Sequence, residues 1–395
     1  MTKDEKIQNL LQKGVVEIIH KDHLLKALKS GKKLRVKLGI DPTSPNIHIG
    51  RAVVLWKLRA FQELGHQVVF IVGDFTGQIG DTSDKDAERP MLSEAEIKKN
   101  LKTYFEQAYK ILDKKKTEVH YNSTWLKGLG FAEIGRLANM FGLHEFSSRE
   151  NIAKRMNAGK RVSLRELLYP LMQGYDSVAV KADVELGGTD QRFNVLAGRT
   201  IQEGYGMKPQ DILITQLIEG TDGRKMSSSW RNTINLTDAP DVMFGKAMSI
   251  PDTLMDTYFL LTANFSEKEL KDVKKEIKNP RDLKIKLASS LVEMYYDSST
   301  ATKAREGFIA QFSNKELPTE IPEQKVKAGN YSLVDLLVIT KLTSSKGEAR
   351  RLIAQNGVKL NQKVMNGELA EKPIVVANKN NLILQVGKRK FVKIK

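Results

Sequence analysis

The sequence contains no cysteine, which excludes disulfide bonds, thiol nucleophiles and zinc or iron–sulfur sites with cysteine ligands. Its six histidines all lie within the first 144 residues, so a zinc enzyme is not expected. No segment approaches the ~20 consecutive apolar residues that a membrane-spanning helix needs. The first residues, MTKDEKIQNL, are charged rather than apolar. We therefore expect a cytoplasmic protein with no membrane partner and no tightly bound metal.

The charge is strongly unbalanced. The 395 residues, enough for two to three domains of ~150 residues, include 64 Lys and Arg against 47 Asp and Glu, a net charge of +17. Residues 331–395 alone hold ten Lys and three Arg against one Asp and three Glu. This excess suits a polyanionic partner such as nucleic acid, and it marks the C-terminal segment as a separate basic unit.

The first half of the chain alternates strand and helix patterns. Residues 34–40 (LRVKLGI) and 67–73 (QVVFIVG) read as strands, and the segment 49–64 between them reads as a helix. A capping box at Ser93 predicts a helix that runs to about Leu112, followed by the short strand TEVHY. The alternation predicts an α/β fold, a Rossmann-like doubly wound domain with a parallel sheet.

The pattern changes along the second half. From residue 229 to 318 the β-branched runs thin out and helical periodicity dominates, so we expect a catalytic domain over 1–228 and an α-helical domain over 229–318. Residues 319–330 hold proline and glycine without apolar periodicity and are expected to form a linker. Residues 331–395 read as two short helices and several strands, a small α+β domain.

The loop GIDPTSPNIHIGR, residues 39–51, follows the first of these strands. Open α/β sheets bind ligands at the carboxyl ends of strands, and helix N-termini attract phosphate. His48 could donate to a phosphate oxygen, Gly50 would allow close backbone approach, and Thr43 offers a hydroxyl. Taken alone, the tripeptide HIG is more often an ordinary connection with a helix-capping histidine.

A second loop, TDGRKMSSSW at residues 221–230, carries Arg224 and Lys225 at the expected border of the two domains. A mobile cationic loop in this place could close over phosphate groups. Taken alone, it resembles any basic surface loop.

Three polar side chains share one face of a predicted helix. Tyr169, Gln173 and Asp176 stand at positions i, i+4 and i+7, which places them in a wedge of about 60°. Pro170 could start or kink this helix. The wedge is either a solvated face or one wall of a pocket for a polar ligand.

Together, HIG and KMSSS resemble the HIGH and KMSKS signatures of class I aminoacyl-tRNA synthetases, in the same order along the chain. The stretch YPLMQGYDSVAVKADVELGGTDQRFN resembles the amino-acid-binding region of tyrosyl-tRNA synthetases, and GDFTGQIGD with Lys85 and Arg89 resembles the matching ATP-side loop. The resemblance to the bacterial-type tyrosyl-tRNA synthetases covers essentially the whole chain.

The resemblance implies that tyrosine and ATP form tyrosyl-adenylate, which then esterifies tyrosine tRNA, and that Mg²⁺ accompanies the ATP. Asp176 would accept the phenolic proton, while Tyr169, Gln173 and Asp81 would hold the ammonium group. The implied tyrosine-binding residues are Lys37, Gly39, Asp81, Tyr169, Gln173, Asp176 and Gln191. The implied ATP-binding residues are Asp41, Thr43, His48, Gly50, Arg51, Gly188, Asp190, Lys225, Met226, Ser227 and Ser228. The implied catalytic residues, as clamps on phosphate oxygens, are Thr43, His48, Lys85, Arg89 and Lys225.

Three positions depart from common family patterns. Arg51 replaces the last histidine of HIGH, and Ser228 replaces the second lysine of KMSKS. Arg51 keeps a cationic donor, and Arg224 could compensate beside Lys225. Lys37 stands where one branch of the family has a tyrosine that contacts the phenol, so specificity would rest more on Asp176.

The C-terminal segment LTSSKGEARRLIAQNGVKLNQKV resembles the RNA-binding domain named after the small-subunit ribosomal protein S-four. Lys346, Arg350 and Arg351 would present cations to the RNA backbone. By the same resemblance, the helical domain reads the anticodon side of the tRNA, and residues of about 125–165 form the interface of a homodimer.

Two other functions remain open from the sequence. The chain could be a non-enzymatic RNA-binding protein on a synthetase scaffold, given Arg51, Ser228 and the basic C-terminal segment. It could also be a related adenylate-forming synthetase for another amino acid, although Asp176 argues against tryptophan.

Overall fold

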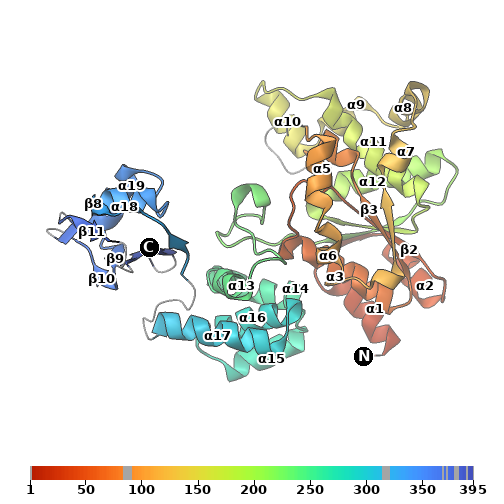
Figure 1. The fold of residues 1–395 in the computed structure, drawn as a ribbon. Coiled ribbons are helices and arrows are strands. Elements are labelled where there is room, and N and C mark those ends of the chain that lie inside the picture. The colour runs from red at the N-terminus through yellow and green to blue at the C-terminus, as the bar shows by residue number, and fades with distance from the viewer. Residues whose placement is uncertain are drawn as a thin grey trace. The chain divides into compact units, whose positions relative to one another are not determined.

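A six-stranded sheet lies at the centre of the larger part of the chain (Figure 1). The strand order is β1-β6-β5-β2-β3-β4; β2 to β6 are parallel, and β1 pairs antiparallel with β6. The bounds are β1 Val15–Ile19, β2 Arg35–Ile40, β3 Gln67–Val72, β4 Thr117–Tyr121, β5 Val184–Gly188 and β6 Asp211–Thr215. The expected doubly wound α/β fold is confirmed. Strand order reverses between β2 and β5, which is where such sheets bind ligands.

The computed structural model describes residues 2–82, 91–313, 321–366, 369–370, 372–377, 382–387 and 390–394. These residues form two compact units, Met1–Phe308 and Ile309–Lys395.

Both faces of the sheet are covered, as β3 shows. Val68, Phe70 and Val72 belong to the large core that includes α1, α2 and α3, whereas Val69 and Ile71 pack on the other face with residues that follow α11. Alternate residues of a strand point to opposite faces, so a strand buried on both sides is apolar throughout. This explains the unbroken apolar run QVVFIV.

Capping residues that can be recognised in the sequence begin two of the helices around the sheet. Ser93 caps α5 and Ser163 caps α11, each with the side chain of a glutamate three residues later completing a capping box. Pro170 lies inside α11 without ending it. The bounds are α1 Lys3–Gln12, α2 Lys21–Lys29, α3 Ile49–Glu63, α4 Thr76–Ile79, α5 Glu94–Leu101, α6 Tyr104–Ala108, α7 Ser123–Leu126, α8 Phe131–Ala138, α9 Leu143–Ser147, α10 Glu150–Asn157, α11 Leu164–Ala179 and α12 Arg192–Gly204.

Two details differ from the sequence expectation. The helix predicted from Ser93 to about Leu112 is divided into α5 and α6, because the chain turns at 102–103 and Tyr104 then packs, 1% exposed, against the core. In addition, the first 33 residues, for which no element was predicted, form α1, β1 and α2. The antiparallel strand β1 closes one edge of the sheet, and its short sequence VVEII has no local feature that reveals its partner.

Five helices follow the last strand of the sheet: α13 Pro240–Ala247, α14 Met255–Leu261, α15 Glu267–Glu276, α16 Pro280–Tyr295 and α17 Ser298–Ser313. Their buried residues share one hydrophobic core with α1, α3 and the sheet. Polar contacts also join α16 and the segment before α13 to the sheet region. Trp56 Nε1 donates to Tyr295 Oη on α16 (3.3 Å), and Lys110 Nζ donates to the carbonyl of Leu236 before α13 (2.9 Å). The division at 228/229 stays a prediction.

The C-terminal unit has its own hydrophobic core, which contains Leu336, Val358 and Leu384. Two helices, α18 Leu333–Ile339 and α19 Lys346–Ala354, accompany two small sheets. The strands are β7 Glu323–Gln324, β8 Gly329–Tyr331, β9 Val358–Leu360, β10 Lys363–Val364, β11 Ile374–Val376, β12 Leu382–Val386 and β13 Lys390–Ile394. The segment 319–330, expected to be a linker, contributes β7, which pairs with β13, and the start of β8. Strands of two or three residues have no readable periodicity, so their distant partners decide their structure.

Among the described helices, none has both the length and the apolar composition required to span a bilayer. Within the same part of the chain, no cluster of three or more His, Asp or Glu side chains is arranged to hold a metal ion.

Candidate active site

A cavity of about 980 Å³ opens at the carboxyl ends of the central strands. Its walls come from the segments that follow β2, β3, β5 and β6, together with α11 and the loop of residues 225–230. These strands flank the point where strand order reverses, so the position agrees with the rule for open α/β sheets.

His48 lies at the start of α3, where it caps the helix. Its Nδ1 accepts the backbone N–H of Arg51 (3.3 Å), and the chain on both sides is held by backbone bonds to the carbonyl of Ile234 and the N–H of Leu236. Burial, with the nearby cations Arg51 and Lys225, lowers the pKa of His48 to about 3. The ring is therefore neutral, and because Nδ1 is an acceptor, its proton lies on Nε2.

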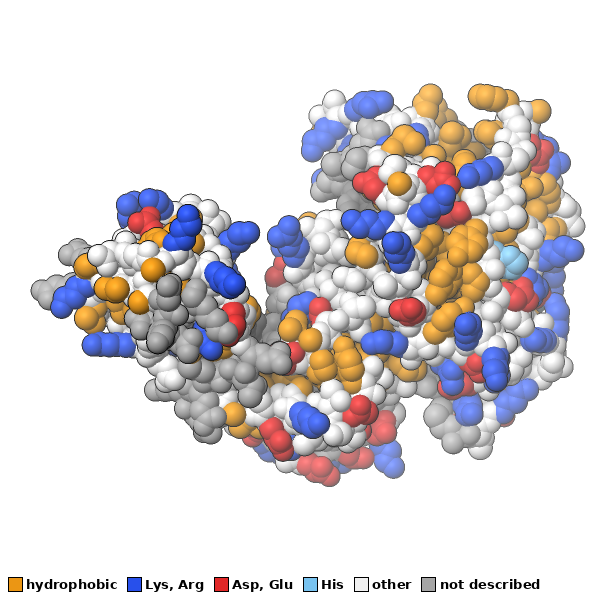
Figure 2. Space-filling model, viewed as in Figure 1, with side chains coloured by type: hydrophobic (Ala, Val, Ile, Leu, Met, Phe, Trp, Pro, Cys, Tyr) orange, Lys and Arg blue, Asp and Glu red, His pale blue; other side chains and the backbone are white. Residues whose placement is uncertain are grey.

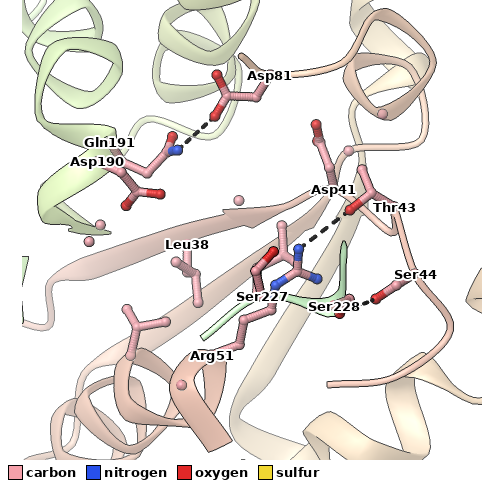
Figure 3. A pocket seen from close by; sticks show the side chains of 18 of the residues that line it. Leu38, Asp41, Thr43, Ser44, Arg51, Asp81, Asp190, Gln191, Ser227 and Ser228 are labelled. Atoms are coloured by element: carbon pink, nitrogen blue, oxygen red, sulfur yellow. Dashed lines mark hydrogen bonds between the residues drawn. The ribbon is translucent and has the colours of Figure 1, made fainter. Parts of the chain in front are cut away.

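Hydroxyl groups and Arg51 line one end of the cavity (Figure 3). Arg51 donates to Tyr104 Oη (2.9 Å) and, through its other nitrogen, to Thr43 Oγ1 (3.4 Å). Ser44 Oγ and Ser228 Oγ are 3.4 Å apart, which brings the two motif loops together. Because the two 3.4 Å bonds are long, the side chains that form them can exchange them for bonds to a ligand. We name this region the hydroxyl end.

Lys225 reaches the cavity from the second motif loop. Its Nζ lies 3.0 Å from Asp190 Oδ2, and both side chains are partly exposed. Asn232, 3% exposed, holds the loop by accepting from the backbone N–H of Ser227 (2.8 Å). Arg224 does not line the cavity; it pairs with Asp222 and lies over the Trp230 ring. The suggestion that Arg224 compensates beside Lys225 stays a prediction.

The opposite end of the cavity, which we name the carboxylate end, holds a dense set of buried and partly buried polar groups. Tyr169 Oη donates to Asp41 Oδ2 (2.8 Å), and Thr76 Oγ1 donates to Asp41 Oδ1 (2.7 Å). Burial and the surrounding carboxylates raise the pKa of Tyr169 well above its ordinary value, so its hydroxyl keeps its proton. A Cβ on Gly73 would lie 1.9 Å from Asp41 Oδ1, so only glycine leaves room for this arrangement.

Asp81 and Gln191 meet across the same end (Figure 3). Gln191 Nε2 donates to Asp81 Oδ2 (2.7 Å), and Gln191 Oε1 accepts from Asn194 Nδ2 (3.1 Å). Gln191 is thereby oriented from α12 while Asp81 follows α4. With Asp41, they provide acceptor oxygens suited to a cationic ammonium group.

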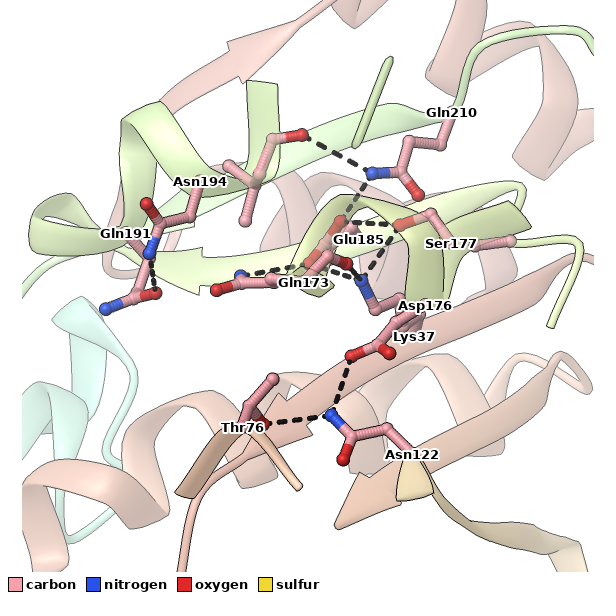
Figure 4. Close-up of polar contacts among 12 residues, drawn as sticks. Lys37, Thr76, Asn122, Gln173, Asp176, Ser177, Glu185, Gln191, Asn194 and Gln210 are labelled. Carbon is pink, nitrogen blue, oxygen red and sulfur yellow. Dashed lines mark hydrogen bonds and ion pairs between the residues drawn. The ribbon is translucent and has the colours of Figure 1, made fainter. Parts of the chain in front are cut away.

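Asp176 lies at the bottom of this end, 3% exposed (Figure 4). Its Oδ1 accepts from Trp125 Nε1 (2.8 Å) and its Oδ2 from Asn122 Nδ2 (3.3 Å). Burial raises the pKa of Asp176 to about 7, although Lys37 and both donors act to lower it. A buried carboxylate with remaining acceptor capacity selects a ligand that carries a hydroxyl.

Lys37 has a different place from the one expected. It does not line the cavity, and its side chain is 0% exposed. Its three ammonium hydrogens are donated to the carbonyl of Gln173 (2.9 Å), Ser177 Oγ (2.8 Å) and Glu185 Oε1 (2.8 Å). Because an ammonium has three donors, none remains for a ligand in this arrangement.

The other predicted ligand-binding residues that the structure describes line one cavity. They are Gly39, Asp41, Thr43, His48, Gly50, Arg51, Asp81, Tyr169, Gln173, Asp176, Gly188, Asp190, Gln191, Lys225, Met226, Ser227 and Ser228. Lys85 and Arg89 lie outside the described residues. Lys346, Arg350 and Arg351 belong to the C-terminal unit, all three on α19.

Sequence reasoning missed Asn122, Trp125 and Lys160. Asn122 directly follows β4 and lines the cavity, so the rule that ligands bind at strand ends could have identified it. Lys160 also lines the cavity, from the turn before α11. Trp125 has no such signal, because only its contact with Asp176, 51 residues away in the chain, reveals its role.

Two known protein families match consecutive parts of the chain. Residues 29–313 match the family described as "tRNA synthetases class I (W and Y)", and residues 314–394 match the "Tyrosine--tRNA ligase SYY-like C-terminal domain". A tyrosine–tRNA ligase of Thermotoga maritima is 45% identical over 400 residues, covering 100% of this chain and 98% of the relative. One from Coxiella burnetii is 44% identical over 392 residues, covering 98% and 97%.

Solved structures share the fold. The tyrosyl-tRNA synthetase of Archaeoglobus fulgidus, crystallised with L-tyrosine, has a TM-score of 0.61 and 21% identity, covering 77% of this chain and 100% of that one. A truncated mitochondrial tyrosyl-tRNA synthetase of Aspergillus nidulans has a TM-score of 0.64 and 19% identity, covering 79% and 94%. The family matches and the full-length identity show that the chain belongs to the class I tRNA synthetases of the tryptophan and tyrosine family, and within it to the tyrosine–tRNA ligases.

Proposed function

We propose that the cavity forms tyrosyl-adenylate and then transfers tyrosine to tRNA. A carboxylate oxygen of tyrosine attacks the α-phosphorus of ATP, the bond to the bridging oxygen of the β-phosphate breaks, and pyrophosphate leaves. A hydroxyl of the terminal ribose of tRNA then attacks the carbonyl carbon, and AMP leaves. One observation carries this proposal. The carboxylate end with its buried Asp176 and the two motif loops, residues 39–51 and 221–230, line the same cavity.

At the carboxylate end, the phenol of tyrosine would donate to Asp176. Trp125 and Asn122 both donate to that carboxylate, so its orientation does not depend on the ligand. The ammonium group would bind among Tyr169, Gln173, Asp81 and Gln191. An amino acid without the hydroxyl would leave Asp176 buried with an unused acceptor site, which disfavours phenylalanine.

At the hydroxyl end, the phosphates of ATP would meet preoriented donors. His48 offers Nε2–H from a neutral ring, Thr43 offers its hydroxyl, and Lys225 would exchange Asp190 for a phosphate oxygen. Asp190 would then accept from the ribose. Catalysis of this kind depends on positioning and on stabilising negative charge, and Mg²⁺ enters as part of the substrate. Lys85 and Arg89 remain candidates for the same task.

The decisive experiment is ATP–pyrophosphate exchange with each of the twenty amino acids. Exchange with tyrosine alone supports the proposal. Exchange with a different amino acid supports a related synthetase. If folded protein that binds RNA shows no exchange, the chain is an RNA-binding protein on a synthetase scaffold.

We further propose that the C-terminal unit holds tyrosine tRNA. Arg350 and Arg351 are exposed on α19, and Lys346 at its first turn is paired with Asp335 (2.8 Å). Changing all three cations to alanine should weaken tRNA binding, flatten its salt dependence and leave exchange unchanged, because phosphate contacts release counterions. Equal losses of exchange and tRNA charging would contradict this division of labour.

We also propose a homodimer formed through the helices α8 to α11. Phe131 is 93% exposed, Leu164 78% and Leu143 70%, and Figure 2 shows hydrophobic side chains at the top of the larger unit over these helices. A contiguous patch of exposed apolar side chains usually marks an interface. Sedimentation should give twice the chain mass, and Phe131→Asp with Leu164→Asp should give the monomer; a native monomer would refute the interface.

A further inference from the structure

A buried ion pair joins two central strands beneath the cavity. Lys37 on β2 and Glu185 on β5 are direct neighbours in the parallel register, with Nζ 2.8 Å from Oε1, and their side chains are 0% and 1% exposed. Removing two charges from water costs about as much as their attraction returns, so a buried pair is weak evidence for a role in stability. Its partners give a better indication of its role.

Two of the three bonds of Lys37 go to helix α11. They reach the carbonyl of Gln173 and the hydroxyl of Ser177, and the third goes to Glu185 (Figure 4). Glu185 also has other bonding partners, since it accepts hydrogen bonds from Ser177 Oγ (3.1 Å) and from Gln210 Nε2. The pair therefore fastens the middle of α11 to the sheet.

That segment of α11 carries the groups that face the ligand. Gln173 and Asp176 line the cavity, and Ser177 is the next residue along the chain. Among the described residues, Lys37 from β2 and Glu185 from β5 act on the Asp176 carboxyl as charged groups, and Tyr169 on the same helix also interacts with it. The remaining contacts, Trp125 and Asn122, are uncharged donors.

We infer that Lys37 and Glu185 are positioning residues for tyrosine recognition, which hold the middle of α11 in place beneath the cavity without touching the amino acid. This inference rests on the proposed function. Lys37 favours the carboxylate form of Asp176 by attraction, and Glu185 opposes it by repulsion. The two members of the pair therefore shift the pKa of Asp176 in opposite directions.

The test is the pH dependence of kcat/KM for tyrosine in ATP–pyrophosphate exchange. In the native enzyme the activity should rise through pH ~7 as Asp176 loses its proton. Lys37→Met should move this midpoint upward by about one pH unit, giving roughly fivefold lower kcat/KM at pH 7 and recovery near pH 9. Glu185→Gln should move it downward. KM for ATP should change little in both.

Lys57→Met is the matched control. Lys57 is another buried lysine, 8% exposed, but its Nζ bonds to the carbonyl of Leu10, away from the cavity. In Lys57→Met, the pH midpoint of kcat/KM for tyrosine should equal that of the native enzyme. Midpoints that stay fixed, or move the same way in both pair variants, would overturn the inference.

Two further measurements keep the test decisive. Circular dichroism shows whether each variant folds; if Lys37→Met does not, Ser177→Ala removes one bond of Lys37 to α11, and it must raise KM for tyrosine or the positioning role is refuted. Absence of exchange in the native protein would instead refute the proposed function.

Discussion

The two ends of the cavity are built differently. At the carboxylate end, Asp176 and Tyr169 are buried on a helix and their bonds to Trp125 and Asp41 measure 2.8 Å. At the hydroxyl end, the bonds between Arg51 and Thr43 and between Ser44 and Ser228 measure 3.4 Å, and the groups lie on loops or at a helix start.

The difference corresponds to two tasks. An amino acid must be distinguished from close analogues, which requires polar groups held rigidly in a dry pocket. Phosphates change charge and position during the reaction, so their donors must move from resting partners to the substrate. Lys225 on Asp190 is such a resting contact. Variants at the two ends should accordingly affect different kinetic constants.

The largest effect is expected at Lys225. Lys225→Met should lower kcat for exchange by ~10²–10³-fold, because a cation that stabilises the developing negative charge on phosphate is removed. KM for tyrosine should change less than about threefold. Arg224→Met is the neighbouring control and should keep most activity, since Arg224 does not line the cavity. A larger loss at Arg224 would reverse the assignment.

A second, selective effect is expected at Asp176. Asp176→Asn should reduce kcat/KM for tyrosine by ~10–100-fold, because a charged acceptor is lost. The ratio of kcat/KM for tyrosine to that for phenylalanine should fall as well. KM for ATP should stay the same. Asp211→Asn serves as control, since that buried carboxylate bonds to His23 instead. An unchanged preference over phenylalanine would show that another group selects the phenol.

A smaller effect is expected from Gly50→Ala. The new Cβ would lie 3.0 Å from His48 Nδ1 and 3.3 Å from Ile218, so the ring must shift. Misplacing this donor should lower kcat by ~10-fold. Gly245→Ala, in open space on α13, should behave as native protein. Full activity of Gly50→Ala would mean that His48 is not required in this orientation.

The smallest effect is a shift in pH dependence from Trp125→Phe. Loss of the donor to Asp176 Oδ1 removes an influence that lowers the pKa of this carboxyl. The carboxylate would then form at higher pH, so the midpoint of kcat/KM should rise by less than about one unit. Trp56→Phe, whose indole bonds to Tyr295, provides the control. A downward shift would contradict the proposed contact.

Much of the fold and the cavity could be predicted from sequence. The strands β2 and β3 follow from their mostly apolar runs, β4 from its place in the alternation of strands and helices, α5 from its capping box and the cavity from loops at strand ends. The wedge of Tyr169, Gln173 and Asp176 needed only helical geometry, although the sequence left open whether it faced solvent; burial of Asp176 and Tyr169 decides this.

Other features could not be predicted, because their partners are distant in sequence. The strand β1 depends on β6, and β7 depends on β13. Lys37 was expected at the ligand because its position in the chain matches a ligand-contacting residue. Only the packing of β2 against β5 and α11 shows that its donors are already used.

The sequence by itself determined the parallel α/β fold, the two motif loops and the placement of Asp176 on one helix face with Tyr169 and Gln173, because these depend on local periodicity. Tertiary structure alone decided which groups set the charge of Asp176. Lys37 and Glu185 are 148 residues apart in the chain and meet only when the sheet forms. Burial then gives their charges an influence that no local pattern reveals.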